Sequence, residues 1–174
     1  LASYPKSGNT FVRTMLSAYF FSDKGNFDFK YLKSIKQFPS KQLFKKMGVI
    51  SNDTNEILKN YIKAQEYINK RAPLILLKTH SSMFDINDNK FTNLDNSLGV
   101  IYIVRDPRNV VSSFSNHYNL SLKDSSIKMT SDSLLGENSD KKVFTYILSW
   151  KNNYNSWKPF LREKRYLLVK YEDL

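Results

Sequence analysis

The segment best suited to chemistry is residues 4–11, which read Tyr-Pro-Lys-Ser-Gly-Asn-Thr-Phe. It stands between an expected strand end and an expected helix start, where unpaired N–H groups and the helix dipole favour an anion. Lys6 adds a full charge, and Gly8 allows close backbone approach. The other side-chain donors are Ser7, Asn9 and Thr10. The segment predicts a phosphate cradle, although an ordinary Pro/Gly turn capped by its serine and asparagine explains the same residues.

This cradle differs from the Walker A loop, which reads Gly-x-x-x-x-Gly-Lys-Ser/Thr. There the lysine follows the second glycine, whereas Lys6 precedes Gly8, the only glycine of the segment. The segment thus has the position in the fold of a phosphate-binding loop, but its side chains differ from those of a Walker A loop. A P-loop-type nucleotide-binding phosphotransferase stays open as an alternative, disfavoured because the neighbouring strand offers no obvious carboxylate for Mg²⁺.

A second strand-to-helix junction lies at residues 104–113. Arg105 stands at the carboxyl end of its strand, where ligands of open α/β sheets bind. Ser113 follows Asp106 by seven residues, about two helical turns, and so returns to the side of the helix that carries the cap. Arg105 and Ser113 can therefore grip one anion together. The alternatives are a salt bridge for the arginine and a bond to the helix backbone for the serine.

Lys78-Thr79-His80 closes another apolar run, whose carboxyl edge we expect beside the cradle. A neutral imidazole can take the proton of an acceptor hydroxyl, and the unperturbed pKa of histidine suits this task near neutrality. A lone histidine at a strand end is also a common structural hydrogen-bonding group. The neighbouring lysine and the two anion motifs favour the base, whereas His117 is interpreted as structural.

Short apolar runs bounded by turn residues predict the strands that hold these motifs, because such runs suit strands buried on both faces of a parallel sheet. They cover residues 74–77, 100–104 and 166–169, and residues 1–3 read as a strand end. Helical spacing predicts helices over residues 9–22, 54–70 and 107–118, and a long one from a Ser139 cap through Trp157. The polar, poorly periodic segments are 23–53, 81–98 and 119–138, of which the last two are predicted to be mobile loops.

The composition limits the function classes. The chain has 174 residues, with 27 Lys and Arg against 16 Asp and Glu and a formal net charge of +11. The length suits one domain, no apolar run reaches the ~18–20 residues of a membrane span, and no cysteine is present. With two histidines, no metal site is expected. The charge predicts an anionic partner or a solvated lysine-rich surface, and a basic nucleic-acid-binding module stays open on charge alone.

The order of residues 4–11 resembles the 5′-phosphosulfate loop of sulfotransferases, which use 3′-phosphoadenosine-5′-phosphosulfate (PAPS) and release the product PAP. The resemblance implies that this loop holds the phosphosulfate and that Phe11, in place of the family's tryptophan, stacks on the adenine. Arg105, with Ser113 eight residues later, resembles the family's 3′-phosphate-binding segment.

Two further matches extend the resemblance. Lys-Thr-His implies that His80 is the catalytic base and that Lys78 lies near the transferred sulfuryl group. In the proposed in-line transfer, Lys6 and the N–H groups near Gly8 stabilise the leaving phosphate. Tyr171 begins a Tyr-Glu-Asp segment, and the resemblance implies that its ring lies against the adenine. The alternative is a tyrosine at the edge of the hydrophobic core.

The resemblance spans residues 1–174 and implies a three-layer, P-loop-like α/β fold with a central parallel sheet flanked by helices. We expect a single sulfotransferase domain truncated at both ends, without the family's Gly-rich basic segment that completes the grip on the 3′-phosphate. The implied reaction moves a sulfuryl group from PAPS to a hydroxyl or amine of a small-molecule or glycan acceptor. No nucleic acid, membrane span or metal takes part, and a cytoplasmic location is expected.

Overall fold

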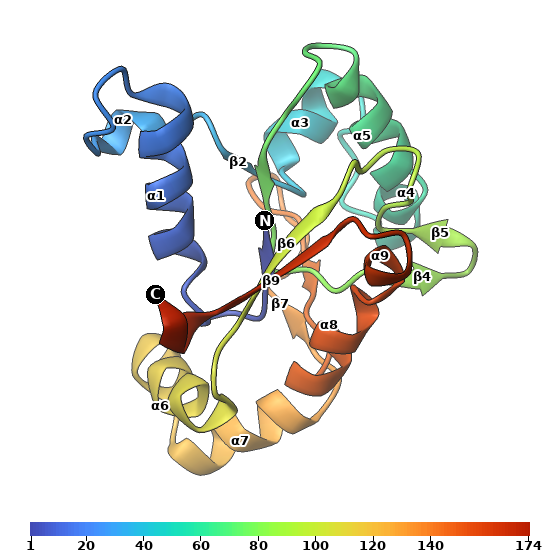
Figure 1. The fold of residues 1–174 in the computed structure, drawn as a ribbon. Helices are drawn as coiled ribbons and strands as arrows, with labels where there is room; N and C mark the ends of the chain where they lie inside the picture. The colour runs from blue at the N-terminus through green and yellow to red at the C-terminus, as the bar shows by residue number, and fades with distance from the viewer.

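A parallel sheet forms the centre of the computed structural model, which describes residues 1–174 (Figure 1). Its three principal strands pair in the order β1 (Ala2–Ser3), β6 (Val100–Val104) and β9 (Tyr166–Lys170). β6 is paired with β9 along its whole length, with Val100 opposite Tyr166. The two apolar runs are therefore confirmed as neighbouring strands, but only β6 is buried. β9 is an edge strand on which Leu167 is 56% exposed, so its predicted burial on both faces is wrong.

Two more parallel strands, β2 (Lys36–Gln37) and β3 (Leu77–Lys78), extend the sheet beside β1. A bridge between Ala2 and Thr79 joins them to it, and the Thr79 N–H donates to the Leu1 carbonyl at 2.8 Å. The predicted strand over 74–77 is thus wrong for its first three residues. Pairing begins only at Leu77, because β2 offers a partner only from that point.

The two helices that follow the anion motifs have nearly the predicted bounds. α1 (Asn9–Phe21) begins after Gly8, whose φ of 97° lies in the left-handed region that favours glycine. α6 (Pro107–Tyr118) begins with proline at its first position, and the side chain of Asp106 accepts a hydrogen bond from the Arg108 N–H at 2.9 Å. Both helices therefore start at the carboxyl ends of central strands.

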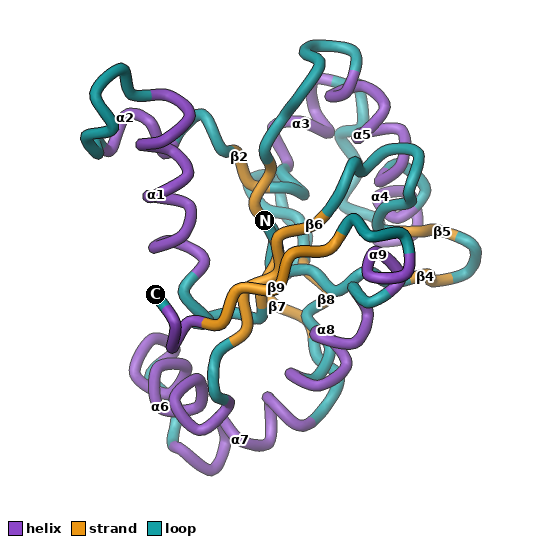
Figure 2. Tube along the Cα trace, in the orientation of Figure 1, coloured by secondary structure: helices purple, strands orange, loops and turns teal.

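The remaining elements surround the sheet (Figure 2). The helices are α2 (Phe29–Leu32), α3 (Lys41–Lys46), α4 (Thr54–Leu58), α5 (Tyr61–Asn69), α7 (Leu122–Thr130), α8 (Trp150–Ser156) and α9 (Pro159–Arg162), with a final 3₁₀ turn η1 (Tyr171–Asp173). Antiparallel pairs are formed by β4 (Asp85–Ile86) with β5 (Asn89–Lys90) and by β7 (Leu134–Leu135) with β8 (Thr145–Tyr146). This arrangement confirms an α/β fold with a parallel sheet flanked by helices.

The predicted long helix from Ser139 is wrong. The chain first forms β8 and then starts α8 only after Ser149, whose side chain caps it by accepting from the Asn152 N–H. Leu148 has a φ of 55°, and a left-handed residue cannot continue a right-handed helix. The apolar spacing that predicted one helix is also met by a strand, a sharp turn and a shorter helix.

Two other predictions also need correction. The helix over 54–70 is divided into α4 and α5, because the Asn60 side chain donates to the Glu56 carbonyl at 2.7 Å and competes with the helix backbone. The predicted mobile loops contain regular structure: segment 81–98 includes the β4–β5 pair, and segment 119–138 includes α7 and β7. Ser121 caps α7 by accepting from the Asp124 N–H at 3.0 Å.

Aromatic packing fixes the helices against the sheet. The buried ring of Tyr61 in α5 lies 5.5–5.9 Å from the rings of Phe38, Phe44, Phe84 and Phe91, mostly edge to face. A second cluster joins Tyr4 of the cradle to Val110 and Phe114 of α6 and to residues of α7 and β8–α8. The cradle and α6 are therefore held in one packed unit.

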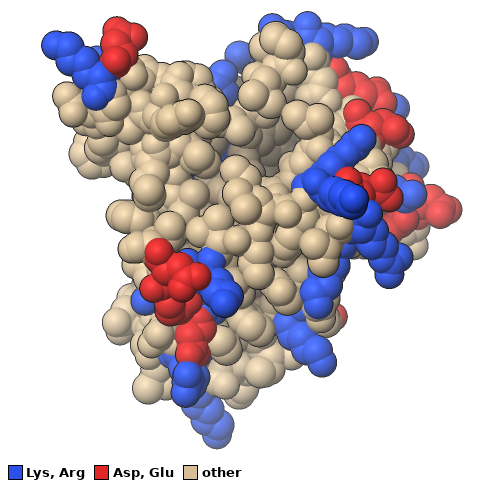
Figure 3. Space-filling view, viewed as in Figure 1, with Lys and Arg blue, Asp and Glu red and all other residues tan.

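Charged side chains are scattered over the face shown in Figure 3. Lys and Arg lie around the rim, often beside Asp or Glu, and the middle of this face is uncharged. On this face the basic residues do not merge into one continuous patch. None of the helices combines the length and the apolar character that crossing a bilayer would demand.

Candidate active site

The cradle is a tight turn between β1 and α1. The Ser7 N–H donates to the Tyr4 carbonyl at 3.3 Å, and the Val12 N–H donates to the Gly8 carbonyl at 3.2 Å. Lys6 has a φ of 68° and Gly8 a φ of 97°, so left-handed residues occur on both sides of Ser7. Residues that alternate between right-handed and left-handed backbone conformations direct successive N–H groups into one concave site, which suits an anion.

Several buried polar atoms around this turn have no protein partner. They are Ser7 Oγ, Asn9 Oδ1 and Arg105 Nε. Ser7 is fully buried, and a buried polar group without a hydrogen bond costs roughly 1–3 kcal/mol. A phosphate has acceptor oxygens for the hydroxyl and the guanidinium N–H, so the residues present fit the phosphate ends of PAPS.

His80 is connected to the cradle through Ser3. Its Nδ1 lies 3.0 Å from the Ser3 carbonyl oxygen and 3.3 Å from Ser3 Oγ. The Asn9 amide in turn donates to Ser3 Oγ at 3.1 Å and to the Thr79 carbonyl at 3.4 Å. Because a carbonyl oxygen only accepts, Nδ1 carries the proton in the neutral ring, and Nε2 keeps the lone pair that a base needs.

The surroundings of His80 keep its ring neutral. Burial is the largest cause that lowers the imidazole pKa, and the positive charges of Lys78 and Lys6 lower it further. The hydrogen bond to Ser3 opposes these effects, and the resulting pKa is about 3. At neutral pH the ring is thus a proton acceptor rather than a cation.

Lys78 lies two residues before His80, and it is close enough for its charge to lower the pKa of the imidazole. Its ammonium donates to Gln37 Oε1 of β2 at 3.2 Å. Burial, followed by the charge of Arg13 in α1, lowers the pKa of Lys78 from 10.5 to about 8. The lysine is therefore held in a partly desolvated, electropositive place near the imidazole.

Arg105 reaches the cradle directly. Its Nη1 donates to the Lys6 carbonyl at 3.2 Å, and its guanidinium lies 4.4 Å from the centre of the Tyr171 ring. The same ring lies so close to Gly8 that a Cβ there would overlap Tyr171 Cδ2. Glu172 accepts a hydrogen bond from the Asp106 N–H at 2.9 Å, which holds η1 against the start of α6.

The other predicted residues have fewer contacts. Phe11 is 50% exposed on α1, and Thr10 is exposed at the start of the same helix. Ser113 is half-buried in α6, and no hydrogen bond joins it to Arg105. The structure thus brings together the cradle, His80, Lys78, Arg105 and Tyr171, while the role of Ser113 stays a prediction.

Sequence reasoning missed three participants. The Ser3 carbonyl carries no side-chain signature, so no motif could have revealed it. Arg13 had a usable signal, because it follows Asn9 by one helical turn and therefore lies on the same side of α1. Glu172 stands in the Tyr-Glu-Asp segment but was not assigned a contact.

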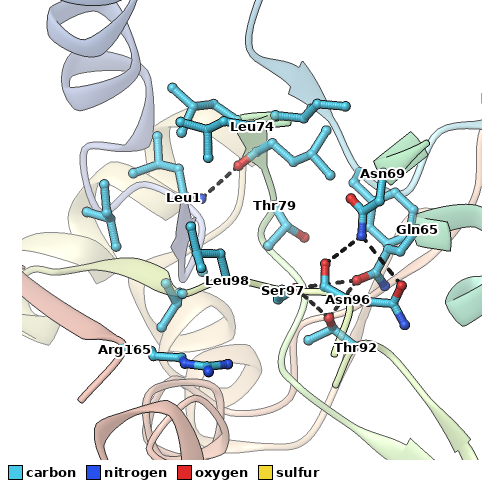
Figure 4. Close-up of a pocket in the computed structure, with 18 of the residues that line it drawn as sticks. Leu1, Gln65, Asn69, Leu74, Thr79, Thr92, Asn96, Ser97, Leu98 and Arg165 are labelled. Atoms are coloured by element: carbon cyan, nitrogen blue, oxygen red, sulfur yellow. Dashed lines mark hydrogen bonds between the residues drawn. The ribbon is translucent and has the colours of Figure 1, made fainter. Parts of the chain in front are cut away.

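A cavity of about 880 Å³ lies elsewhere. Figure 4 shows Leu1, Leu74, Leu98 and Arg165 around it, at the amino ends of the strands. Thr92 in its lining bonds to Gln65 and Ser97, and the histidine and the cradle do not line it. The chemistry-bearing residues are therefore at the opposite, carboxyl edge of the sheet.

These features define an α/β domain with a candidate anion site and a neutral imidazole at the carboxyl edge of its parallel sheet. Within that class, residues 1–174 match the family model described as "Sulfotransferase domain", so the chain belongs to this family. None of the curated proteins matches the sequence.

A solved structure of mouse sulfotransferase SULT7A1, described as complexed with PAP, resembles this chain with a TM-score of 0.54 and 19% identity. The match covers 99% of this chain and 50% of the mouse chain, so residues 1–174 span about half the length of that protein. At this identity, the likeness concerns the fold.

Proposed function

We propose that this chain carries the nucleotide site and the catalytic base of a PAPS-dependent sulfotransferase, which moves a sulfuryl group to a hydroxyl or amine. The observation that carries the proposal is the continuous hydrogen-bonded path from Asn9 in the cradle through Ser3 to His80. It joins an anion site to a neutral proton acceptor. Membership of the family and the PAP described for the mouse relative support the choice of nucleotide.

His80 is the proposed base. The Ser3 carbonyl orients the ring through Nδ1, so the acceptor's proton moves to Nε2. A positioned general base contributes about 10²–10⁴-fold to the rate. Because the imidazole pKa is low, the ring is already unprotonated when the acceptor arrives.

Lys6 and the N–H groups of the cradle are proposed to stabilise the leaving phosphate. PAPS supplies the sulfuryl group: the acceptor's new S–O or S–N bond forms as the S–O bond to the 5′-phosphate breaks, and that oxygen keeps the electron pair. Preorganised donors aimed at developing charge contribute about 3–4 kcal/mol each. Lys78 is assigned to the sulfuryl oxygens, since it lies beside His80 and its ammonium is partly desolvated.

The other end of the nucleotide is assigned to Arg105 and Ser113 for the 3′-phosphate, with Phe11 and Tyr171 beside the adenine. The unpartnered Arg105 Nε and the exposed Phe11 ring support this assignment. The contact of Arg105 with the Lys6 carbonyl gives it a second role in holding the cradle. Residues 1–174 are proposed to act as one domain on a small-molecule or glycan acceptor, and the family resemblance alone suggests the cytoplasm.

Thermal unfolding of the intact protein tests the nucleotide assignment. PAP should stabilise the protein by about 2.7 kcal/mol at a hundredfold excess over its Kd, whereas ATP should stabilise it far less. Preferential stabilisation by ATP with Mg²⁺ would support a phosphotransferase instead. Equal, strongly salt-dependent binding of any polyanion would support a nucleic-acid-binding module.

Replacing Arg105 separates its two roles. Arg105→Ala should weaken PAP far more than adenosine 5′-phosphosulfate, because only PAP carries a 3′-phosphate. The exposed Arg162 of α9 supplies the control, and Arg162→Ala should change neither affinity. Equal losses for both ligands would mean that Arg105 acts through the cradle alone.

A further inference from the structure

Arg13 is a partly buried cation that the proposed reaction does not use. It follows Asn9 by one turn of α1, and Asn9 contacts the end of β3 through the Thr79 carbonyl. One arm of its guanidinium, Nη2, donates to the Leu32 carbonyl at the end of α2. Its Nε is buried and has no partner. Arg13 therefore has an unused donor on the helix that borders the candidate active site.

Arg13 and Lys78 are anchored to the same short segment from different elements. Arg13 bonds to Leu32, and Lys78 bonds to Gln37, five residues further along the chain. Lys78 also precedes His80 by two residues in the segment that carries the base. The two cations are close enough to influence each other, and Lys78 is close enough to His80 for its charge to lower the pKa of the imidazole.

No carboxylate balances these two charges. The ion pairs in the structure are Lys30 with Asp28 and Arg108 with Asp106. The atoms that do contact Arg13 and Lys78 are a carbonyl and a side-chain amide, which are neutral. Burial and the charge of Arg13 lower the pKa of Lys78 to about 8, as expected for two nearby cations without a counter-ion.

We propose that Arg13, beside Lys78, forms an anion subsite on the acceptor side of His80, and that the acceptor carries a carboxylate, sulfate or phosphate group that binds there. This inference rests on the proposed sulfotransferase function. The donor's phosphates already have the cradle and Arg105, whereas Arg13 lies one helical turn beyond the cradle. Arg13 is accordingly a specificity-determining residue, with an anionic acceptor as the substrate class.

Binding to the intact, PAP-saturated protein tests the subsite without requiring turnover. The probes are inorganic sulfate, 4-hydroxyphenylacetate and the neutral 4-methylphenol, each titrated in thermal unfolding. Sulfate and the carboxylate should stabilise the wild type more than the neutral phenol does. Arg13→Gln should weaken both anions at least about tenfold, since the variant removes a charge-assisted hydrogen bond to the anion. Arg13→Lys should retain most of the anion binding.

Arg71 provides a matched control, because it is exposed beyond the end of α5, stacked on Tyr67. Arg71→Gln should leave every titration unchanged. Anion binding that is equal in wild type and Arg13→Gln would overturn the subsite, as would a wild type that does not distinguish the anions from the neutral phenol. PAP binding is measured first in each protein. A wild type that does not bind PAP contradicts the proposed function, whereas a wild type that binds PAP but not the anions contradicts only the subsite.

Steady-state kinetics distinguish the donor from the acceptor as the source of the anion. In Arg13→Gln, KM for an anionic acceptor should rise about tenfold while KM for PAPS stays near the wild-type value. A rise in KM for PAPS alone would assign Arg13 to the donor's sulfuryl group and would overturn the acceptor assignment.

Discussion

The two edges of the parallel sheet differ in how their buried polar atoms are satisfied. At the amino edge, Thr92 donates to Gln65 Oε1, Gln65 donates to the Phe91 carbonyl, and Asn69 donates to the Asn96 carbonyl (Figure 4). At the carboxyl edge, atoms of Ser7, Asn9 and Arg105 are buried without partners. The amino-edge cavity thus has one unpartnered buried atom, Tyr166 Oη, whereas the candidate site has three, one of them on a cation.

Loss of the base should give the largest effect. His80→Ala should reduce kcat by about 10²-fold or more, while the PAP affinity persists because the cradle is intact. His117, exposed in the last turn of α6, provides the control, and His117→Ala should keep the wild-type rate. A wild-type rate in His80→Ala would remove this residue from the base role and would weaken the contrast between the two edges.

A change at the amino edge should affect stability and leave the chemistry intact. Gln65→Met leaves the Phe91 carbonyl without its side-chain donor and leaves the Thr92 hydroxyl with Ser97 as its side-chain partner, which should lower the free energy of unfolding by about 1–3 kcal/mol. Gln42→Met, at an exposed position of α3, should leave stability near that of the wild type. If PAP affinity fell in parallel with the stability of Gln65→Met, the amino edge would be part of the nucleotide site.

The pH profile should show the smallest effect. Since the pKa of His80 is lowered to about 3, the ring is neutral above that value, and kcat/KM should be nearly flat between about pH 5 and pH 7. Activity should fall above pH 8 as Lys78, with a pKa of about 8, loses its charge, and Lys78→Arg should move that limb upward. An acid limb near 6.5 would show that the imidazole keeps its ordinary pKa.

The elements that the sequence predicted correctly are those with strong local signals. Asp106 and Pro107 define the start of α6, and continuous apolar runs define β6 and β9. The start of α8 was missed because it depends on the left-handed backbone of Leu148, which periodicity does not reveal. β3 is shorter than its apolar run because pairing depends on a neighbour that is distant in the sequence.

The same distinction applies to the candidate site. The residue types of the cradle and of Lys-Thr-His predicted an anion site and a base, and the structure brings them together through Ser3. The orienting carbonyl of Ser3 and the anchoring of Arg13 on Leu32 depend on tertiary contacts. They could be recognised only after the chain was folded.

The contact of Tyr171 with Gly8 and Arg105 has a consequence for the order of assembly. It unites the cradle, the carboxyl end of β6 and the turn η1, so the proposed nucleotide pocket needs segments that are far apart in the sequence. Contacts of such long range form late, because closing the intervening loops is entropically unfavourable. During refolding, PAP should therefore bind only chains in which the sheet is complete, and partly folded chains should have no affinity for the nucleotide.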